Sequence, residues 1–124
     1  MKLFFFLAIG GTIGTWSRYL LQGLVQPPSG SFPWGTLVVN IVGAFALGFF
    51  MRFLLGSAAA GPEVRAAVTI GFCGAFTTMS TFSFETVALL GDGEYWRASA
   101  YMLGTVIGGV AAIVAGTATA SRLL

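Results

Sequence analysis

Ten charged residues divide the chain into long apolar stretches. They stand at positions 2, 18, 52, 63, 65, 85, 92, 94, 97 and 122, and the intervals between them hold four mostly apolar runs. A helix needs about 20 such residues to cross a bilayer, and the runs at about 3–25, 34–55, 63–90 and 95–121 each reach that length. The pattern predicts an all-α integral membrane subunit of four transmembrane helices, with residues 1–124 as a single membrane domain.

Turn signals separate these runs. Residues 26–33 are polar and rich in proline, residues 56–61 are small and lead to Pro62, and Gly91-Asp92-Gly93 is typical of a turn. Lys2 and the apolar residues after it resemble a signal peptide, but the apolar character continues to Leu24, so we expect the first segment to be retained.

Composition excludes several classes of protein. Hydrophobic residues make up 56% of the chain and charged residues 8%, whereas a soluble domain carries about 25% charged residues. A soluble domain and a disordered chain are therefore both excluded. The net charge is +2, but the basic residues are spread along the chain and form no cluster, which argues against nucleic acid as a partner. With no His and one Cys, Cys73, a disulfide framework and an ordinary zinc or iron–sulfur site are excluded.

Positive charge indicates the orientation only weakly. An even number of spans puts both termini and the 56–61 linker on one side of the membrane. That side holds Lys2, Arg52, Arg65 and Arg122, against Arg97 and Arg18 for the other. We expect a modest bias toward cytoplasmic termini, in the inner (plasma) membrane.

Small residues recur four apart on the predicted helices, a spacing that lets helix backbones approach closely in lipid. The pairs are Gly10 and Gly14, Ala44 and Gly48, and Gly104 and Gly108.

Polar residues inside the predicted spans are candidates for function, because an unpaired polar group in hydrocarbon is costly. Asn40 lies near the middle of the second span, with Thr36 one turn before it. Its amide either serves the function or bonds to a neighbouring helix.

Residues 71–83 combine two glycines with three threonines and two serines at mid-membrane depth. This composition favours a break in the third helix, where free carbonyls could bind a small cation and free N–H groups an anion. The alternative is an unbroken helix whose hydroxyls bond to the preceding turn.

On the fourth span, Tyr101 and Thr105 share one face, as a polar track or as a packing face with incidental hydroxyls. Glu85 needs a partner or water; Arg18 is the candidate partner by charge, but the sequence does not show that the two side chains meet. No catalytic dyad and no phosphate loop is present, so we expect conduction or transport and no enzymatic activity.

Three segments together resemble the CrcB/Fluc family of fluoride channels. They read GGTIGTWSRY at 10–19, GTLVVNIVG at 35–43 and GFCGAFTTMSTFSFE at 71–85. The resemblance implies an antiparallel, dual-topology homodimer with two fluoride pores and a central structural Na⁺ that is not transported. It also implies passive export that lowers cytoplasmic fluoride toxicity.

The resemblance also assigns roles to individual residues. It puts Asn40, Ser80, Thr81 and Phe82 in the fluoride pore, with Tyr101 and Thr105 near a hydroxyl track, and Arg18 at a pore mouth. The backbone carbonyls of Gly74 and Thr77 are expected to coordinate the sodium ion. Met79 departs from the family, which has a pore phenylalanine there: a phenyl edge can meet an anion, whereas a thioether is a soft packing group.

Two other functions remain open. A small multidrug transporter is also a four-helix, dual-topology protein, but it needs a carboxylate in its first helix, where this chain has only Arg18. A non-conducting interaction protein would use its polar residues only to hold helices together.

Overall fold

The computed structural model describes residues 1–57 and 60–124, which are helical and contain no strand. Three long helices are continuous: α1 (Lys2–Val25), α2 (Trp34–Gly56) and α6 (Tyr95–Leu123). Between α2 and α6 the chain forms α3 (Pro62–Ala66), the π-helical segment η1 (Ala67–Cys73), α4 (Gly74–Phe76) and α5 (Met79–Gly91). The predicted linker at 56–61 includes residues 58–59, which lie outside the described residues.

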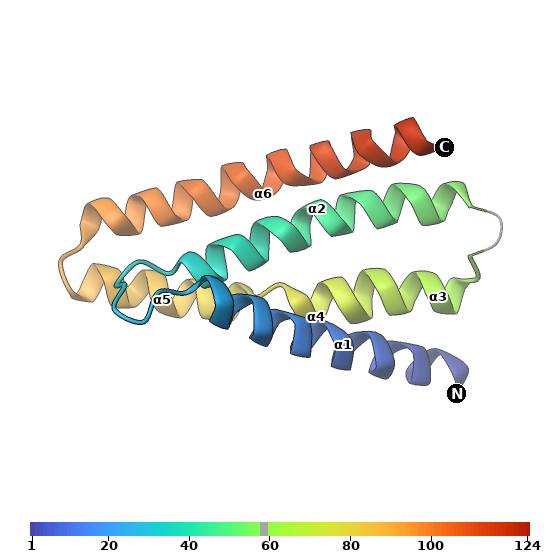
Figure 1. The fold of residues 1–124 in the computed structure, drawn as a ribbon, viewed down its shortest axis with the longest axis horizontal. Coiled ribbons are helices and arrows are strands. Elements are labelled where there is room, and N and C mark those ends of the chain that lie inside the picture. The colour runs from blue at the N-terminus through green and yellow to red at the C-terminus, as the bar shows by residue number, and fades with distance from the viewer. Residues whose placement is uncertain (58–59) are drawn as a thin grey trace.

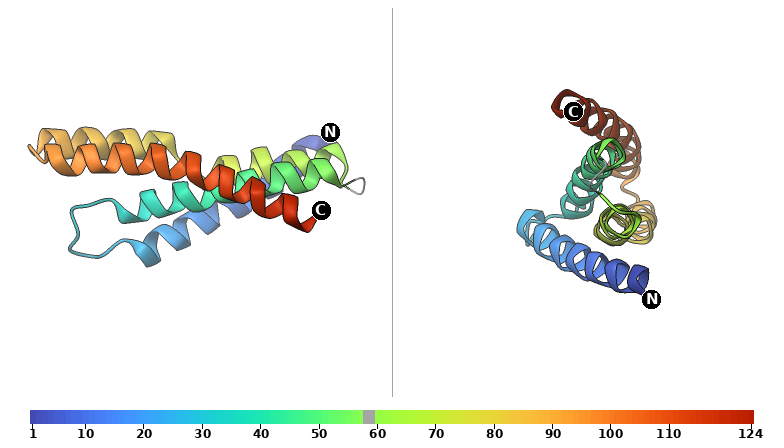
Figure 2. Two further views of the ribbon diagram at one scale, coloured as in Figure 1. Left: turned by 90° about the horizontal axis from the view of Figure 1, so that it is seen from above. Right: turned by 90° about the vertical axis from the view of Figure 1, so that its right-hand side faces the viewer.

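The helices run back and forth along one axis, so that both termini lie at the same end of the subunit (Figure 1). Figure 2 shows α1 and α6 on opposite flanks, with α2 and the α3–α5 run between them. α2 packs mainly on α6, and α1 mainly on η1 and α4. The subunit is therefore splayed, with many large apolar side chains on its surface.

Local sequence explains where the helices begin. Pro62 stands at the first position of α3 and Glu63 in its first turn, where a negative charge favours the helix N-terminus. Before α2, Gln26 holds the loop: its Oε1 accepts a hydrogen bond from Gly35 N (3.0 Å), and its Nε2 donates to Phe32 O (3.1 Å). The proline-rich loop is thereby tied to the first turn of α2.

Gly10 and Gly14 bring α1 close to η1. A Cβ on Gly10 would overlap the backbone of Ala67, and one on Gly14 would overlap the backbone of Phe72. Both glycines are buried. This pair follows the predicted small-residue spacing.

The other two predicted pairs lie between α2 and α6 and differ from each other. A Cβ on Gly48 would overlap the backbone of Ile113 in α6. On α6 itself, a Cβ on Gly108 would lie 3.0 Å from the Ile41 side chain, whereas one on Gly104 would be 4.0 Å from its nearest neighbour. The contact between α2 and α6 is therefore closer at Gly48 and Gly108 than at Gly104.

Three helical runs in the described residues are long and apolar enough to cross a membrane: Trp34–Gly56, Pro62–Gly91 and Tyr95–Leu123. α1 has 24 residues, which is a spanning length, but Ser17, Arg18 and Gln22 interrupt its apolar sequence. The crossing of the membrane by the first predicted span stays a prediction.

Candidate functional site

The third helical run breaks at Thr77 and Thr78. α4 ends at Phe76, and both threonines have extended backbone angles (φ −82°, ψ 159° and φ −148°, ψ 114°) before α5 begins at Met79. This break lies within residues 71–83, where the sequence predicts one. In a membrane-spanning segment, backbone that leaves the helix must be satisfied by protein or line a cavity.

The side-chain amide of Asn40 bonds to the peptide groups at the break. Its Oδ1 accepts a hydrogen bond from Thr78 N (2.8 Å), and its Nδ2 donates to Thr78 O (3.1 Å). Asn40 therefore bonds to a neighbouring segment of the chain, which is one of the two alternatives that the sequence allowed. A primary amide carries two N–H donors, and this arrangement uses one of them.

Thr78 caps the helix that follows. Its Oγ1 accepts a hydrogen bond from Thr81 N (3.2 Å) and donates to Thr81 Oγ1 (2.9 Å). On the other side of the break, Thr77 N and Thr77 Oγ1 both donate to Cys73 O. The two threonines thus form hydrogen bonds with backbone groups on either side of the break.

The same contacts change the environment of two backbone carbonyls. In a continuous helix, Gly74 O would accept from Thr78 N, and Thr77 O would accept from Thr81 N. Here Thr78 N donates to the Asn40 side chain and Thr81 N to the Thr78 side chain. Gly74 and Thr77 are the residues whose carbonyls are expected to bind sodium, and neither carbonyl accepts its usual helical hydrogen bond.

A second group of polar side chains, the Glu85 network (Gln22, Thr36, Glu85 and Tyr101), joins α1, α2, α5 and α6. Thr36 Oγ1 donates to Glu85 Oε1 (2.9 Å), and Tyr101 OH donates to Glu85 Oε2 (2.7 Å). Gln22 Nε2 donates to Thr36 Oγ1 (3.2 Å). Each carboxylate oxygen therefore accepts one hydroxyl.

This network corrects the expectation that Arg18 partners Glu85. Within residues 1–57 and 60–124 the one ion pair is Arg97–Glu94 (3.5 Å). Hydroxyls from α2 and α6 satisfy Glu85 instead, because the fold brings Thr36 and Tyr101 to the same face of α5. Arg18 is half-buried on α1, and its place at a pore mouth stays a prediction.

The remaining candidate residues fall on two sides of α5. The Phe82 ring is buried against Tyr101, with ring centroids 5.0 Å apart. Met79 is 72% exposed, and Gly74 and Ser80 are also exposed; we call the face that these three residues mark the open face. On α6, Thr105 Oγ1 is buried without a hydrogen-bond partner in the described residues.

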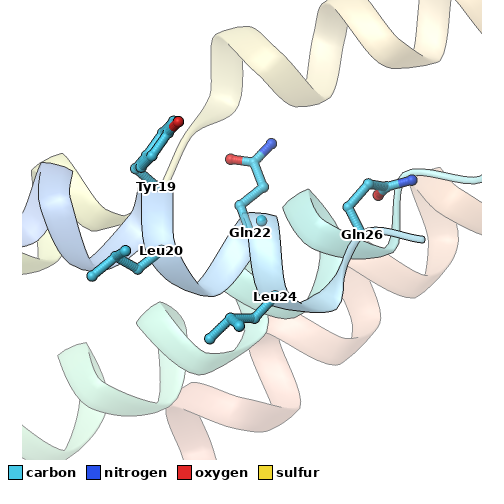
Figure 3. Close-up of a pocket in the computed structure, with 6 residues that line it drawn as sticks. Tyr19, Leu20, Gln22, Leu24 and Gln26 are labelled. Carbon is cyan, nitrogen blue, oxygen red and sulfur yellow. The ribbon is translucent and has the colours of Figure 1, made fainter. Parts of the chain in front are cut away.

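A polar cavity of about 260 Å³, the mouth cavity, opens at the end of the subunit opposite the termini. Gln22, Gln26, Glu85, Asp92 and Glu94 are among the residues that line it. Figure 3 shows a different pocket beside the same end of α1, and Gln22 and Gln26 line both that pocket and the mouth cavity. Two members of the Glu85 network, Gln22 and Glu85, thus line this cavity, whereas Thr36 and Tyr101 are fully buried.

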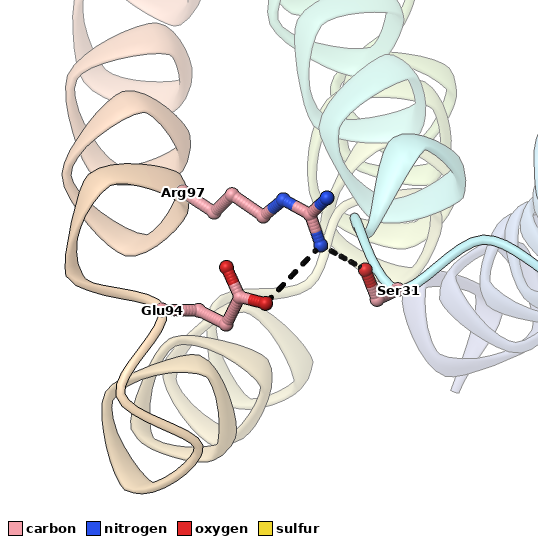
Figure 4. A network of polar contacts seen from close by, with 3 residues as sticks. All are labelled: Ser31, Glu94 and Arg97. Carbon is pink, nitrogen blue, oxygen red and sulfur yellow. Dashed lines mark hydrogen bonds and ion pairs between the residues drawn. The ribbon is translucent and has the colours of Figure 1, made fainter.

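Arg97 connects two segments beside the mouth cavity. Its Nη1 donates to Ser31 Oγ in the α1–α2 loop and pairs with Glu94 just before α6 (Figure 4). Both Arg97 and Glu94 are over 40% exposed in their side chains, so this pair contributes little stability.

Two features were not predicted from the sequence: the contact of Gln22 and the π-helical form of residues 67–73. Gln22 could have been found, because Arg18, Gln22 and Gln26 are spaced four apart and so share one face of a helix. For the π-helical segment we find no signal in the sequence.

Comparison with known proteins decides the family. The model of the CrcB-like protein, Camphor Resistance (CrcB) family matches residues 5–117. The chain belongs to the CrcB family. This match covers the break, Asn40 and the Glu85 network.

Curated members of the CrcB family extend the match over most of the chain. A protein of Geotalea uraniireducens (strain Rf4) is 49% identical over 108 residues, which are 86% of this chain and 87% of the relative. One from Aquifex aeolicus (strain VF5) is 46% identical over 111 residues (89% and 90%), and one from Chlorobium phaeobacteroides (strain DSM 266 / SMG 266 / 2430) is 42% identical over 117 residues (94% and 91%).

All three relatives are named fluoride-specific ion channel FluC. The CrcB family to which the chain belongs is thus one of ion channels and not of enzymes, in agreement with the prediction. Together with the apolar helical runs, this identifies a multi-pass integral protein of the plasma membrane.

Proposed function

We propose that the chain is a passive fluoride channel that exports fluoride and so lowers its toxicity in the cytoplasm. The observation that carries the proposal is the broken helix held by Asn40, in a family whose curated members are named fluoride channels. An anion path needs donors that replace the hydration shell of the ion but bind weakly enough to release it. Neutral amides and hydroxyls meet both requirements.

Several neutral donors of the described residues suit such a path. Asn40 keeps one amide N–H beyond its bond to Thr78. Thr105 carries a buried hydroxyl without a protein partner, and the Phe82 ring lies beside Tyr101. With Ser80 and Thr81 at the start of α5, these residues form the proposed pore, which Met79 borders in place of a phenylalanine.

The proposed active form is an antiparallel homodimer with two pores and one structural Na⁺ at its centre. Hard cations take oxygen ligands, and the carbonyls of Gly74 and Thr77 fit this role because their usual N–H donors are bonded elsewhere. Bound there, the ion would supply a fixed positive charge. Asn40 and Thr78 would keep the carbonyls available.

The test is fluoride efflux from proteoliposomes loaded with fluoride. We expect passive efflux that is faster for fluoride than for chloride, and a dimer in covalent cross-linking. Proton-coupled uptake of an organic cation would support a multidrug transporter instead. The absence of any flux would support the alternative of a non-conducting interaction protein.

Asn40→Asp tests the position of the pore. The substitution keeps the acceptor for Thr78 N but replaces the donor with an anionic oxygen, which repels fluoride and faces Thr78 O. We expect efflux to fall at least tenfold, with Thr119→Val as the control, since its hydroxyl bonds only to Ala115 O on an exposed face. Unchanged efflux in Asn40→Asp would show that Asn40 does not line the path.

A further inference from the structure

Gln22 is a half-buried residue of α1 whose side-chain amide reaches into the Glu85 network. Its Nε2 lies 3.2 Å from Thr36 Oγ1, and the side chain also lines the mouth cavity together with Glu85. The proposed donors of the pore do not include Gln22.

The contact limits where the Thr36 hydroxyl can point. A threonine hydroxyl has one proton and two acceptor lone pairs. Since Gln22 donates to Thr36 Oγ1, one lone pair is occupied, and the proton is directed to Glu85 Oε1 at 2.9 Å. Hydrogen bonds in such a chain polarise and strengthen one another.

Gly35 makes room for Gln22 at this place. A Cβ on Gly35 would lie 2.7 Å from Gln22 Cγ and 2.8 Å from Gln22 O. The close approach of α1 to the first turn of α2 therefore depends on the missing side chain. It brings the amide within hydrogen-bond distance of the next residue, Thr36.

We propose that Gln22 is a positioning residue for conduction: it aims the Thr36 hydroxyl at Glu85 and so keeps the carboxylate bonded to α2 and α6. A carboxylate whose oxygens accept hydroxyl donors presents less negative charge to an anion in the mouth cavity than one that is free to turn into it. This inference rests on the proposed fluoride conduction. The proposal adds a residue of α1 to the residues at the break and on α5 that are proposed to act in conduction.

A double-mutant cycle tests the proposal in liposomes. Gln22→Met keeps the length of the side chain and removes the donor, and we expect efflux to fall about fivefold, the effect of losing one hydrogen bond. Because Gln22 acts through Thr36, the pair Gln22→Met and Thr36→Val should be no slower than Thr36→Val alone.

The matched control is Thr117→Val. Thr117 Oγ1 donates to Gly48 O (3.3 Å), so it also bonds to α2, but twelve residues from Thr36. Its effect on efflux should multiply with that of Thr36→Val. Wild-type efflux in Gln22→Met, or multiplication of the Gln22→Met and Thr36→Val effects, would overturn the proposal.

Infrared spectroscopy provides a readout that does not depend on flux. The chain has three glutamates, at 63, 85 and 94, so ¹³C-carboxyl glutamate gives few bands, and Glu85→Gln identifies the band of residue 85. We expect this band to shift in Gln22→Met and to stay unchanged in Thr117→Val. If Gln22→Met does not assemble, Gln22→Asn is the second variant, since it keeps an amide but shortens its reach.

The two readouts separate the two proposals. A wild-type protein that conducts no fluoride but shows the band shift in Gln22→Met would refute the channel and leave the positioning contact in place. A conducting wild type with no band shift and no change in efflux in Gln22→Met would refute the role of Gln22 alone.

Discussion

Thr78→Val is the sharpest test of how the break in the third helical run is stabilised. Valine keeps the shape of the side chain and leaves both backbone bonds of residue 78 to Asn40 intact. It removes the oxygen that accepts from Thr81 N at 3.2 Å and donates to Thr81 Oγ1 at 2.9 Å. The first turn of α5 then lacks its cap.

The expected cost follows from these two bonds. Removing an N-cap costs about 1 kcal/mol and up to about 2, and a neutral hydrogen bond contributes about 1 kcal/mol. Thr78 is only 6% exposed, so water does not replace the lost oxygen. We expect the free energy of unfolding to fall by about 1–2 kcal/mol.

Thr86→Val is the matched control, because Thr86 is also 6% exposed and lies in the same helix. Its Oγ1 donates to Phe82 O (2.7 Å), a carbonyl that keeps its helical N–H partner, so the loss strands no backbone group. Unfolding in SDS titrations, followed by circular dichroism, measures both variants. Equal losses at 78 and 86, or no loss at 78, would refute the capping role.

Two further substitutions test the packing and the pore. Gly14→Ala, whose Cβ would overlap the Phe72 backbone, should destabilise the protein by about 1–3 kcal/mol, whereas Gly23→Ala on the same helix meets nothing within 4 Å and should cost nothing; equal unfolding free energies would contradict the close α1–η1 contact. Met79→Phe should leave fluoride efflux intact, since the family to which the chain is similar is expected to have a phenylalanine at this position; a loss of efflux would show that this pore is built differently from those of the family.

The sequence predicted the helical runs and the region of the break. Charges and turn residues mark the ends of apolar runs, because a charge inside hydrocarbon is costly wherever it lies in the fold. Glycines beside several hydroxyls likewise weaken a helix through local effects alone. Neither prediction required knowledge of which helices pack against each other.

Partners across helices could not be predicted in the same way. Charge alone suggested Arg18 for Glu85, but a carboxylate is equally satisfied by hydroxyls, and the choice depends on which helix faces which. Thr36 and Tyr101 lie 49 and 16 residues from Glu85 in sequence. The same holds for Asn40, whose position in the sequence was compatible with a functional role and with a bond to a neighbouring helix. In the structure its amide bonds to Thr78 and keeps one N–H that is not used in this contact.

Asn40 and Thr78 satisfy some backbone groups at the break but leave others without their helical partners. Asn40 and Thr78 satisfy three N–H and C=O groups at the break, and they do so by taking the N–H donors that Gly74 O and Thr77 O would have in a helix. In hydrocarbon, a carbonyl without a partner costs several kcal/mol. Gly74 is exposed on the open face of the subunit, with nothing within 4 Å of a Cβ placed there. In the proposed homodimer, a cation shared with a second copy at this face would supply what these carbonyls lack, and the two side chains that stabilise the break would then also favour dimerisation.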